Sequence, residues 1–139
     1  MNVDFWVTKY GTRNPFQIAE RMNIIVLKED LGTINGYYNK AYRQKFIHIN
    51  EHLPDYKSIF TCAHELGHAI LHPNSCTPFL IENTFLSVDK LEVEANSFAL
   101  NLLISNQDLE NHKGYTVEQI ARIYGYSEKL IDLRLRDWR

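Results

Sequence analysis

The feature that most constrains this chain is the pentapeptide HELGH at residues 64–68, which sets two histidines four positions apart with a glutamate between them. On an α-helix, residues four apart share one face with Cβ atoms about 5–6 Å apart, so His64 and His68 can bind one metal ion. Glu65 is turned by roughly 100° from His64 on such a helix, which suits a carboxylate that must reach a water beside the metal. The spacing therefore predicts a metal-binding helix with Zn²⁺ as cofactor and Glu65 as catalytic residue.

The sequence around the pentapeptide indicates that it lies on a helix. Apolar residues recur at the i, i+4, i+7 and i+11 positions expected of a buried face: Ile59, Ala63, Leu66 and Ile70. Asp55 is the expected N-cap. The helix is expected to stop at residues 72–74, because Pro73 cannot continue the hydrogen-bonded ladder.

The size and charge of the chain exclude several function classes. We expect a single domain over residues 1–139, because this length can bury one core and nothing requires a second. A net charge of −2 gives no general attraction to nucleic acid or to an anionic membrane. With no secretion signal and no apolar stretch long enough to cross a membrane, we expect a cytoplasmic protein in which Cys62 and Cys76 are reduced thiols.

Upstream of the pentapeptide, the pattern predicts one helix and three strands. Residues 1–14 show no clear period, and Asn14 and Pro15 then match the N-cap and first residue of a helix over 15–22. Residues 24–26, 33–38 and 45–49 predict a small antiparallel three-stranded sheet. The last of these strands alternates with a period of two, and an extended substrate could pair with it as an added strand.

Downstream of the pentapeptide, residues 74–87 are expected to be an irregular connection, and residues 88–105 a long helix. The buried face of this second helix is expected to carry Leu91, Ala95, Phe98, Ala99, Leu102 and Leu103. The predicted fold class is therefore α+β: an N-terminal helix, the antiparallel sheet, the metal-binding helix, a second helix that carries a ligand glutamate, and a C-terminal helical pair.

The metal site needs a third protein ligand from outside the pentapeptide, because catalytic zinc usually takes three and leaves one position for water. The candidates are Glu92, Glu94, Cys76 and His72. His72 would lie about 12 Å along the helix axis from His64. Because that distance is too long for one shared ion, we expect His72 beside the ligands or at the helix end.

Helical phase separates the two candidate glutamates. Glu94 aligns with Ser97 and Asn101 on a polar, solvated face, whereas Glu92 borders the apolar face and points inward. Burying an unpaired carboxylate is costly, and a metal ion would supply its partner. We therefore predict Glu92 as the third ligand, with Glu94 and Cys76 as alternatives.

These residues resemble the ImmA/IrrE metallopeptidases, zinc proteins of phages, mobile elements and bacteria. The resemblance covers HELGHAILH at 64–72, EVEANSFA at 92–99 with the leucine pair at 102–103, and more loosely residues 47–50. It implies a zincin-like fold, Glu92 as third ligand, and Asn96 as a residue that holds a ligand histidine. It also implies a protein substrate, a helix-turn-helix repressor of a phage or mobile element encoded nearby. The proline that usually follows the leucine pair is replaced by residues 104–105, so the end of this helix is left open.

The motif predicts peptide hydrolysis. Zinc would polarise the scissile carbonyl and lower the pKa of water, while Glu65 would take the proton of that water and pass it to the leaving amine. The oxyanion needs a further donor. Four residues have suitable chemistry, and the sequence does not choose among them: His48, Tyr37, Tyr38 and Tyr56.

The C-terminal subregion, residues 114–139, suggests an alternative to peptide hydrolysis. Residues 116–119 have the form of a capping box, Ser127 caps a second helix, and Gly125 between them permits the tight turn of a helix-turn-helix. This segment could be a DNA-binding or protein-interaction module beside a non-hydrolytic zinc site. Its five basic and four acidic residues, however, nearly cancel in charge, so the segment would attract a phosphate backbone only weakly. We therefore expect no direct nucleic-acid binding, no membrane partner, and a helical pair that covers the core or docks substrate.

Overall fold

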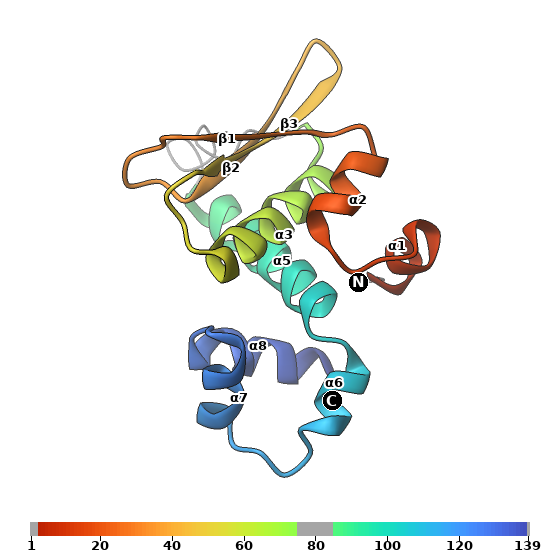
Figure 1. Ribbon diagram of the computed structural model, residues 1–139, viewed down its shortest axis with the longest axis vertical. Coiled ribbons are helices and arrows are strands. Elements are labelled where there is room, and N and C mark those ends of the chain that lie inside the picture. Colours follow the sequence, from red (N-terminus) through yellow and green to blue (C-terminus); the bar gives the residue numbers. More distant parts are fainter. Residues whose placement is uncertain (1–2, 75–84, 139) are drawn as a thin grey trace.

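The computed structural model describes residues 3–74 and 85–138, and side chains from residue 90 onward in the second range (Figure 1). The described part holds seven helices and three strands, which confirms the predicted α+β class. In chain order they are α1 (Val3–Tyr10), α2 (Pro15–Arg21), β1 (Ile25–Glu29), β2 (Gly36–Ala41), β3 (Gln44–Asn50), α3 (Asp55–Leu71), α5 (Phe85–Leu103), α6 (Asn106–Asn111), α7 (Val117–Tyr124) and α8 (Glu128–Trp138).

The sheet has the order β1–β3–β2 and is mixed, which corrects the expectation of an all-antiparallel sheet. β2 and β3 form an antiparallel hairpin whose turn residues, Tyr42 and Arg43, both have positive φ, as a type I′ turn requires. β1 is parallel to β3, because the connection at 30–35 passes the end of β3 before the chain enters β2. Asn50 holds this connection by donating from Nδ2 to the carbonyls of Gly32 and Ile34 at 3.0 and 2.9 Å.

The central position of β3 has a consequence for substrate binding. Both edges of β3 are already paired, one with β1 and one with β2. The prediction that an extended substrate adds to residues 46–49 is therefore wrong. Within the described residues, the outer edges of the sheet belong to β1 and β2.

The sheet packs against α3, and α3 packs against α5 (Figure 1). Ile47 and Ile49 of β3 are fully buried against these helices. The close crossing of α3 and α5 depends on Gly67, because a Cβ at this position would lie 3.2 Å from both the Cα of Ala95 and the ring of Phe98. The third and fourth turns of α3, which carry the pentapeptide, are thereby brought against α5.

The helix ends differ from the sequence predictions in several places. Asp55 is the first residue of α3 and not its N-cap, which is Pro54, and Ile59 is 37% exposed instead of buried. α5 begins at Phe85, within the stretch expected to be irregular. It ends without a proline because Ser105 caps α6 directly, accepting a hydrogen bond from the backbone N–H of Asp108. α1 forms where the sequence pattern showed no period.

The C-terminal helices enclose a second apolar cluster. Its buried members are Leu100, Ile104, Leu109, Ile120, Ala121 and Ile131. The predicted capping box at Thr116 and the left-handed Gly125 after α7 are both present. Phe60 of α3 packs against this cluster and against the main core, so the two clusters meet at α3. None of the helices in the described residues is long and apolar enough to cross a membrane.

Candidate metal centre

Three side chains from two helices converge where α3 crosses α5. His64 and His68 project from α3, and Glu92 projects from α5 between them. One carboxylate oxygen of Glu92 lies 3.1 Å from Nε2 of His64, and the other lies 2.7 Å from Nε2 of His68. The structure therefore brings the three predicted ligands together, although Glu92 is 24 residues from the nearer histidine.

The donor set fits a catalytic zinc ion. Two imidazole nitrogens and one carboxylate oxygen form a known three-ligand set for such ions. Ligand atoms at 2.0–2.1 Å from one tetrahedral ion are about 3.3 Å apart, and the separations of 2.7 and 3.1 Å are close to this value. A small shift of the Glu92 side chain, which is 36% exposed, would complete the fit.

The charges at the site favour an ionised Glu92. Burial alone would raise the pKa of its carboxyl, but the hydrogen bonds to His64 and His68 outweigh burial and lower this pKa to about 2. Burial would lower the pKa of His64, yet Glu92 and Glu65 outweigh this effect and raise it. The carboxylate of Glu92 is thus charged at neutral pH, as a metal ligand must be.

Asn96 fixes the orientation of His64. It lies one turn after Glu92 on α5, and its Oδ1 is 2.8 Å from Nδ1 of His64. An amide oxygen can only accept, so this contact requires a proton on Nδ1 and leaves the lone pair of Nε2 for a metal. The structure places Asn96 where the family resemblance implies it.

His72 has the corresponding position behind His68. The two Nδ1 atoms are 3.1 Å apart, and Nε2 of His72 faces Oε1 of Glu94 at 3.5 Å. Burial, followed by the proximity of His68, lowers the pKa of His72, which favours a neutral ring whose Nδ1 can accept a hydrogen bond from Nδ1–H of His68. Glu94, predicted to lie on a solvated face, thus reaches toward the site through His72.

Glu65 lies beside His64, farther from its Nε2 than Glu92 does. Its side chain is 5% exposed, and its nearer carboxylate oxygen is 3.9 Å from Nε2 of His64. His64, Glu65 and His68 each offer an atom within 4.8 Å of the others. This position allows the carboxylate to act on a water in front of the metal ligands.

A cavity of about 260 Å³ opens beside His64, Glu65 and Glu92. Its lining residues are Asn35, Gly36, Phe60, Thr61, His64, Glu65, Glu92 and Asn96. Gly36 is required here, because a Cβ would lie 2.5 Å from the carbonyl oxygen of His48 and 2.7 Å from Cγ2 of Thr61. The sequence analysis missed Asn35 and Thr61, which belong to no motif and are brought to the site only by the packing of β2 on α3.

Most of the predicted oxyanion donors lie away from this cavity. The two ring nitrogens of His48 contact Glu29 and Asn39, at 2.5 and 2.6 Å, and its ring stacks on Tyr37. The hydroxyl of Tyr38 donates to the carbonyl of Pro73. Tyr56 alone among these candidates lines a pocket that adjoins the metal cavity. Cys76, the remaining ligand alternative, lies outside the described residues.

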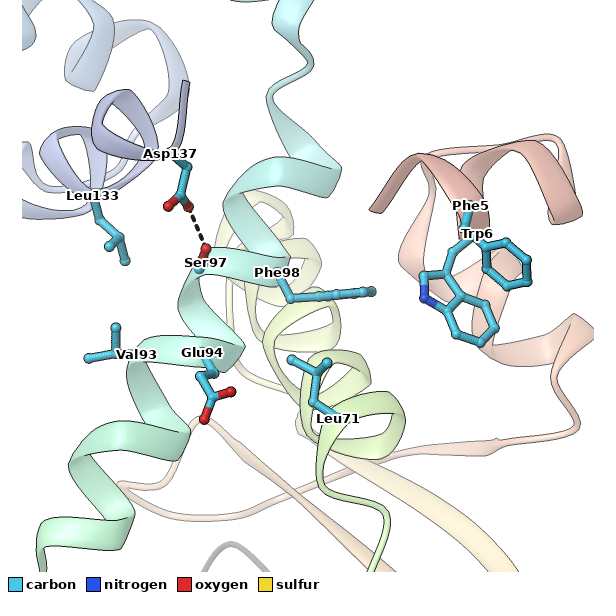
Figure 2. Close-up of a pocket in the computed structure, with 9 residues that line it drawn as sticks. All are labelled: Phe5, Trp6, Leu71, Val93, Glu94, Ser97, Phe98, Leu133 and Asp137. Atoms are coloured by element: carbon cyan, nitrogen blue, oxygen red, sulfur yellow. Dashed lines mark hydrogen bonds between the residues drawn. The ribbon is translucent and has the colours of Figure 1, made fainter. Parts of the chain in front are cut away.

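A larger hollow of about 590 Å³ lies on another face of α5, between α1 and α8 (Figure 2). It is lined by Phe5, Trp6, Leu71, Val93, Glu94, Ser97, Phe98, Leu133 and Asp137. In Figure 2, Ser97 of α5 donates to Asp137 of α8, which ties the C-terminal helix to α5. No metal ligand lines this hollow, so we do not assign the chemistry to it.

Comparison with known proteins gives a consistent result. The family described as IrrE N-terminal-like domain, Peptidase_M78, matches residues 19–136, a range that includes both metal-site helices. "Uncharacterized immunity region protein 2" of Bacillus phage phi105 is 42% identical over 131 residues, which cover 92% of this chain and 83% of that protein. "Metallopeptidase ImmA" of Bacillus subtilis (strain 168) is 36% identical over 135 residues, which cover 93% of this chain and 79% of that protein.

Proposed function

This chain belongs to the ImmA/IrrE family, Peptidase_M78, and is a metallopeptidase; from this premise we propose a zinc-dependent endopeptidase with Glu65 as catalytic residue and His64, His68 and Glu92 as ligands. The observation that carries the proposal is the Glu92 carboxylate, whose two oxygens meet the Nε2 atoms of both histidines. Zinc, when bound, would polarise the scissile carbonyl and lower the pKa of water.

The residues of the chain supply the proton transfers. Glu65, buried beside His64, takes a proton from the attacking water and delivers it to the leaving amine. Asn96 holds His64, and His72 holds His68, so that both Nε2 atoms keep their lone pairs directed toward the Glu92 carboxylate. The contact of Asn96 joins α5 to α3, whereas those of Glu65 and His72 lie within α3 and its C-cap.

We propose that an extended substrate binds along the outer edge of β2. The backbone N–H of Asn50 donates to the carbonyl of Asn35, so in this antiparallel ladder residues 35, 37 and 39 face β3 and alternate residues face outward. Gly36 is one of the outward-facing residues and also lines the metal cavity. A peptide paired with this edge would therefore pass in front of the metal ligands.

For the substrate itself, we propose a helix-turn-helix repressor of a phage or mobile element, encoded near this gene. The support is the family resemblance, together with a relative from a phage that is named an immunity region protein. Because such a repressor works on intracellular DNA, we place the reaction in the cytoplasm.

The rival, a DNA-binding role for the C-terminal pair, loses support in the structure. Arg134, one of the basic residues that could contact phosphate, is 1% exposed. Its guanidinium instead donates to the carbonyl of Ile104 and to the side chain of Asn106. This arginine therefore stabilises the fold and is not available to contact a phosphate.

The deciding experiment incubates the purified chain with the neighbouring repressor, with and without a chelator, and follows cleavage by mass spectrometry. We expect cleavage that the chelator stops and that added zinc restores. An intact repressor in the presence of verified zinc-loaded protein would contradict the proposed substrate. Cleavage that persists after metal removal would contradict the metal-dependent mechanism.

A further inference from the structure

A second pocket, of about 190 Å³, adjoins the metal cavity and is closed on its far side by the C-terminal helical pair. It shares three lining residues with the metal cavity, namely Asn35, Phe60 and Thr61. Its remaining walls come from the first turn of α3 and from the junction of α7 and α8. The metal site and the C-terminal pair thus border one continuous cleft.

An aromatic row connects the two parts of this cleft. The ring of Phe60 is 6.3 Å from the ring of His64 on one side and 5.1 Å from the ring of Tyr126 on the other. Tyr56 packs on Gly125, where a Cβ would lie 3.2 Å from the tyrosine ring. Because Gly125 also has a φ of 76°, no other residue suits this junction as well.

The chemistry of the pocket favours an apolar occupant. Four of its walls are large apolar or aromatic side chains: Tyr56, Phe60, Tyr126 and Leu130. The hydroxyl of Tyr126 is neutral at physiological pH, as in any tyrosine, and burial raises its pKa further, to about 12. Lys57 is the one charged residue in the lining, and it is exposed to solvent. A charged side chain would therefore find no buried partner here.

We infer that the α7–α8 junction forms one wall of a substrate subsite, which takes an aliphatic or aromatic side chain of the polypeptide substrate next to the cleaved bond. The inference rests on the proposed function. A substrate side chain is the expected occupant because the pocket is continuous with the metal cavity. A peptide along β2 would pass Gly36 and Asn35, and Asn35 lines both the metal cavity and this pocket. The volume is more than ten times the roughly 10–15 Å³ that one water needs, which leaves room for a side chain.

The first test measures cleavage preference. Zinc-loaded protein is incubated with a mixture of synthetic peptides of randomised sequence, and the cleaved bonds are read by mass spectrometry. Leu130→Trp fills the pocket and should reduce cleavage beside large apolar residues at least about tenfold relative to cleavage beside small ones, the scale on which hydrophobic pockets discriminate. Tyr126→Ala should shift the preference toward larger residues.

The matched control is Ile123→Trp, which adds the same indole to a 50% exposed position of α7 outside the pocket. This variant should keep the wild-type preference. An unchanged preference in both Leu130→Trp and Tyr126→Ala would overturn the inference. If Leu130→Trp fails to fold, as judged by its melting curve, Tyr126→Ala and the following measurement decide.

The second test needs no turnover. Aromatic and methyl NMR signals of the wild-type protein are followed while N-acetyl-leucine amide is added, and N-acetyl-aspartate amide serves as the polar comparison. Saturable shifts at Phe60, Tyr126 and Leu130 with the leucine probe alone would support the subsite, even if no peptide were cleaved and the proposed function failed. Cleavage of peptides without such shifts, and without a changed preference in the variants, would leave the peptidase standing and remove the subsite.

Discussion

The metal centre and the C-terminal helical pair are both built from two helices that cross tightly beside a glycine, but they bury different kinds of side chain. At the α3–α5 crossing, the buried polar residues His64 and Glu65 line a cavity, and the buried His68 contacts Glu92 behind it. At the α7–α8 turn, the buried residues are apolar, and the buried Arg134 donates to nearby acceptors of the fold. Helix-pair geometry alone therefore does not indicate function; the gathering of two imidazoles and two carboxylates at one crossing does.

The largest expected effect tests what the buried carboxylate at the metal centre does. Glu65→Gln removes the proton acceptor but no ligand, so it should lower the cleavage rate by about 10²–10⁴-fold while zinc per chain stays the same. Cleavage is measured on the repressor, and zinc by elemental analysis of the same sample. Near-normal proteolysis at confirmed zinc loading would contradict the assigned role of Glu65.

The second prediction concerns the ligand that α5 contributes. Glu92→Gln should lose most of its zinc at neutral pH, because an amide oxygen lacks the full negative charge of a carboxylate. The experiment compares zinc per chain with wild type after identical dialysis. Retention of zinc by Glu92→Gln would point to one of the two predicted alternatives, Glu94 or Cys76, as the third ligand.

The third prediction applies the comparison to the C-terminal pair. Arg134→Met leaves the carbonyl of Ile104 without this buried donor, so we expect the free energy of unfolding to fall by about 1–3 kcal/mol with unchanged zinc content. Arg136→Met, at an exposed position of the same helix, should stay within about 0.5 kcal/mol of wild type. Urea unfolding measures both variants. Zinc loss in Arg134→Met would show that the two regions are coupled more tightly than their contacts indicate.

The residues that the sequence predicted for the metal centre lie together in the structure, whereas several features of the remaining fold differ from prediction, and the reason is physical. The helical spacing of His64 and His68 and the phase of Glu92 are local properties, and α3 and α5 preserve both. The parallel pairing of β1, the packing of Asn35 and Thr61, and the contact between Phe60 and Tyr126 depend on residues far apart in the chain. Periodicity within one segment carries no information about such contacts.

Glu94 shows the same limit within a single helix. Its contacts differ from those of Glu92, as the predicted phase requires, since Glu92 meets His64 and His68 and Glu94 meets His72, although the two side chains are 36% and 41% exposed. That phase did not reveal that the end of α3 brings His72 to within 3.5 Å of its carboxylate. The contact depends on the crossing angle of two helices, which the sequence of α5 alone does not determine.

The fourth prediction is a pH dependence confined to the metal centre. The pKa of Glu92 is lowered from 4.5 to about 2, so in metal-free protein this carboxylate stabilises the fold above pH 4.5, and the contribution is lost as pH falls toward 2. The pKa of His64 is raised above 6.5, so its contribution is full below pH 6.5 and is lost as pH rises through the raised value. The free energy of unfolding of the metal-free wild type should therefore exceed that of metal-free Glu92→Gln by the largest amount between about pH 4.5 and 6.5. Urea unfolding across pH 2–8 checks this, and a constant difference between the two proteins would contradict it.

The smallest expected effect tests whether Glu94 matters to the metal at all. Glu94→Gln keeps an oxygen that can accept a hydrogen bond from Nε2 of His72, and the position is partly exposed, so stability should change by no more than about 0.5 kcal/mol and zinc content should stay near wild type.

His72→Phe, the comparison variant, removes the acceptor for Nδ1 of His68 while keeping a ring of similar shape. It should weaken zinc binding by about 10–100-fold, as loss of a partner behind a ligand histidine does. Competition with a chromogenic chelator measures both affinities. If Glu94→Gln lost zinc and Glu92→Gln retained it, the two glutamates would exchange roles, and the Nε2 contacts of Glu92 would no longer identify the third ligand.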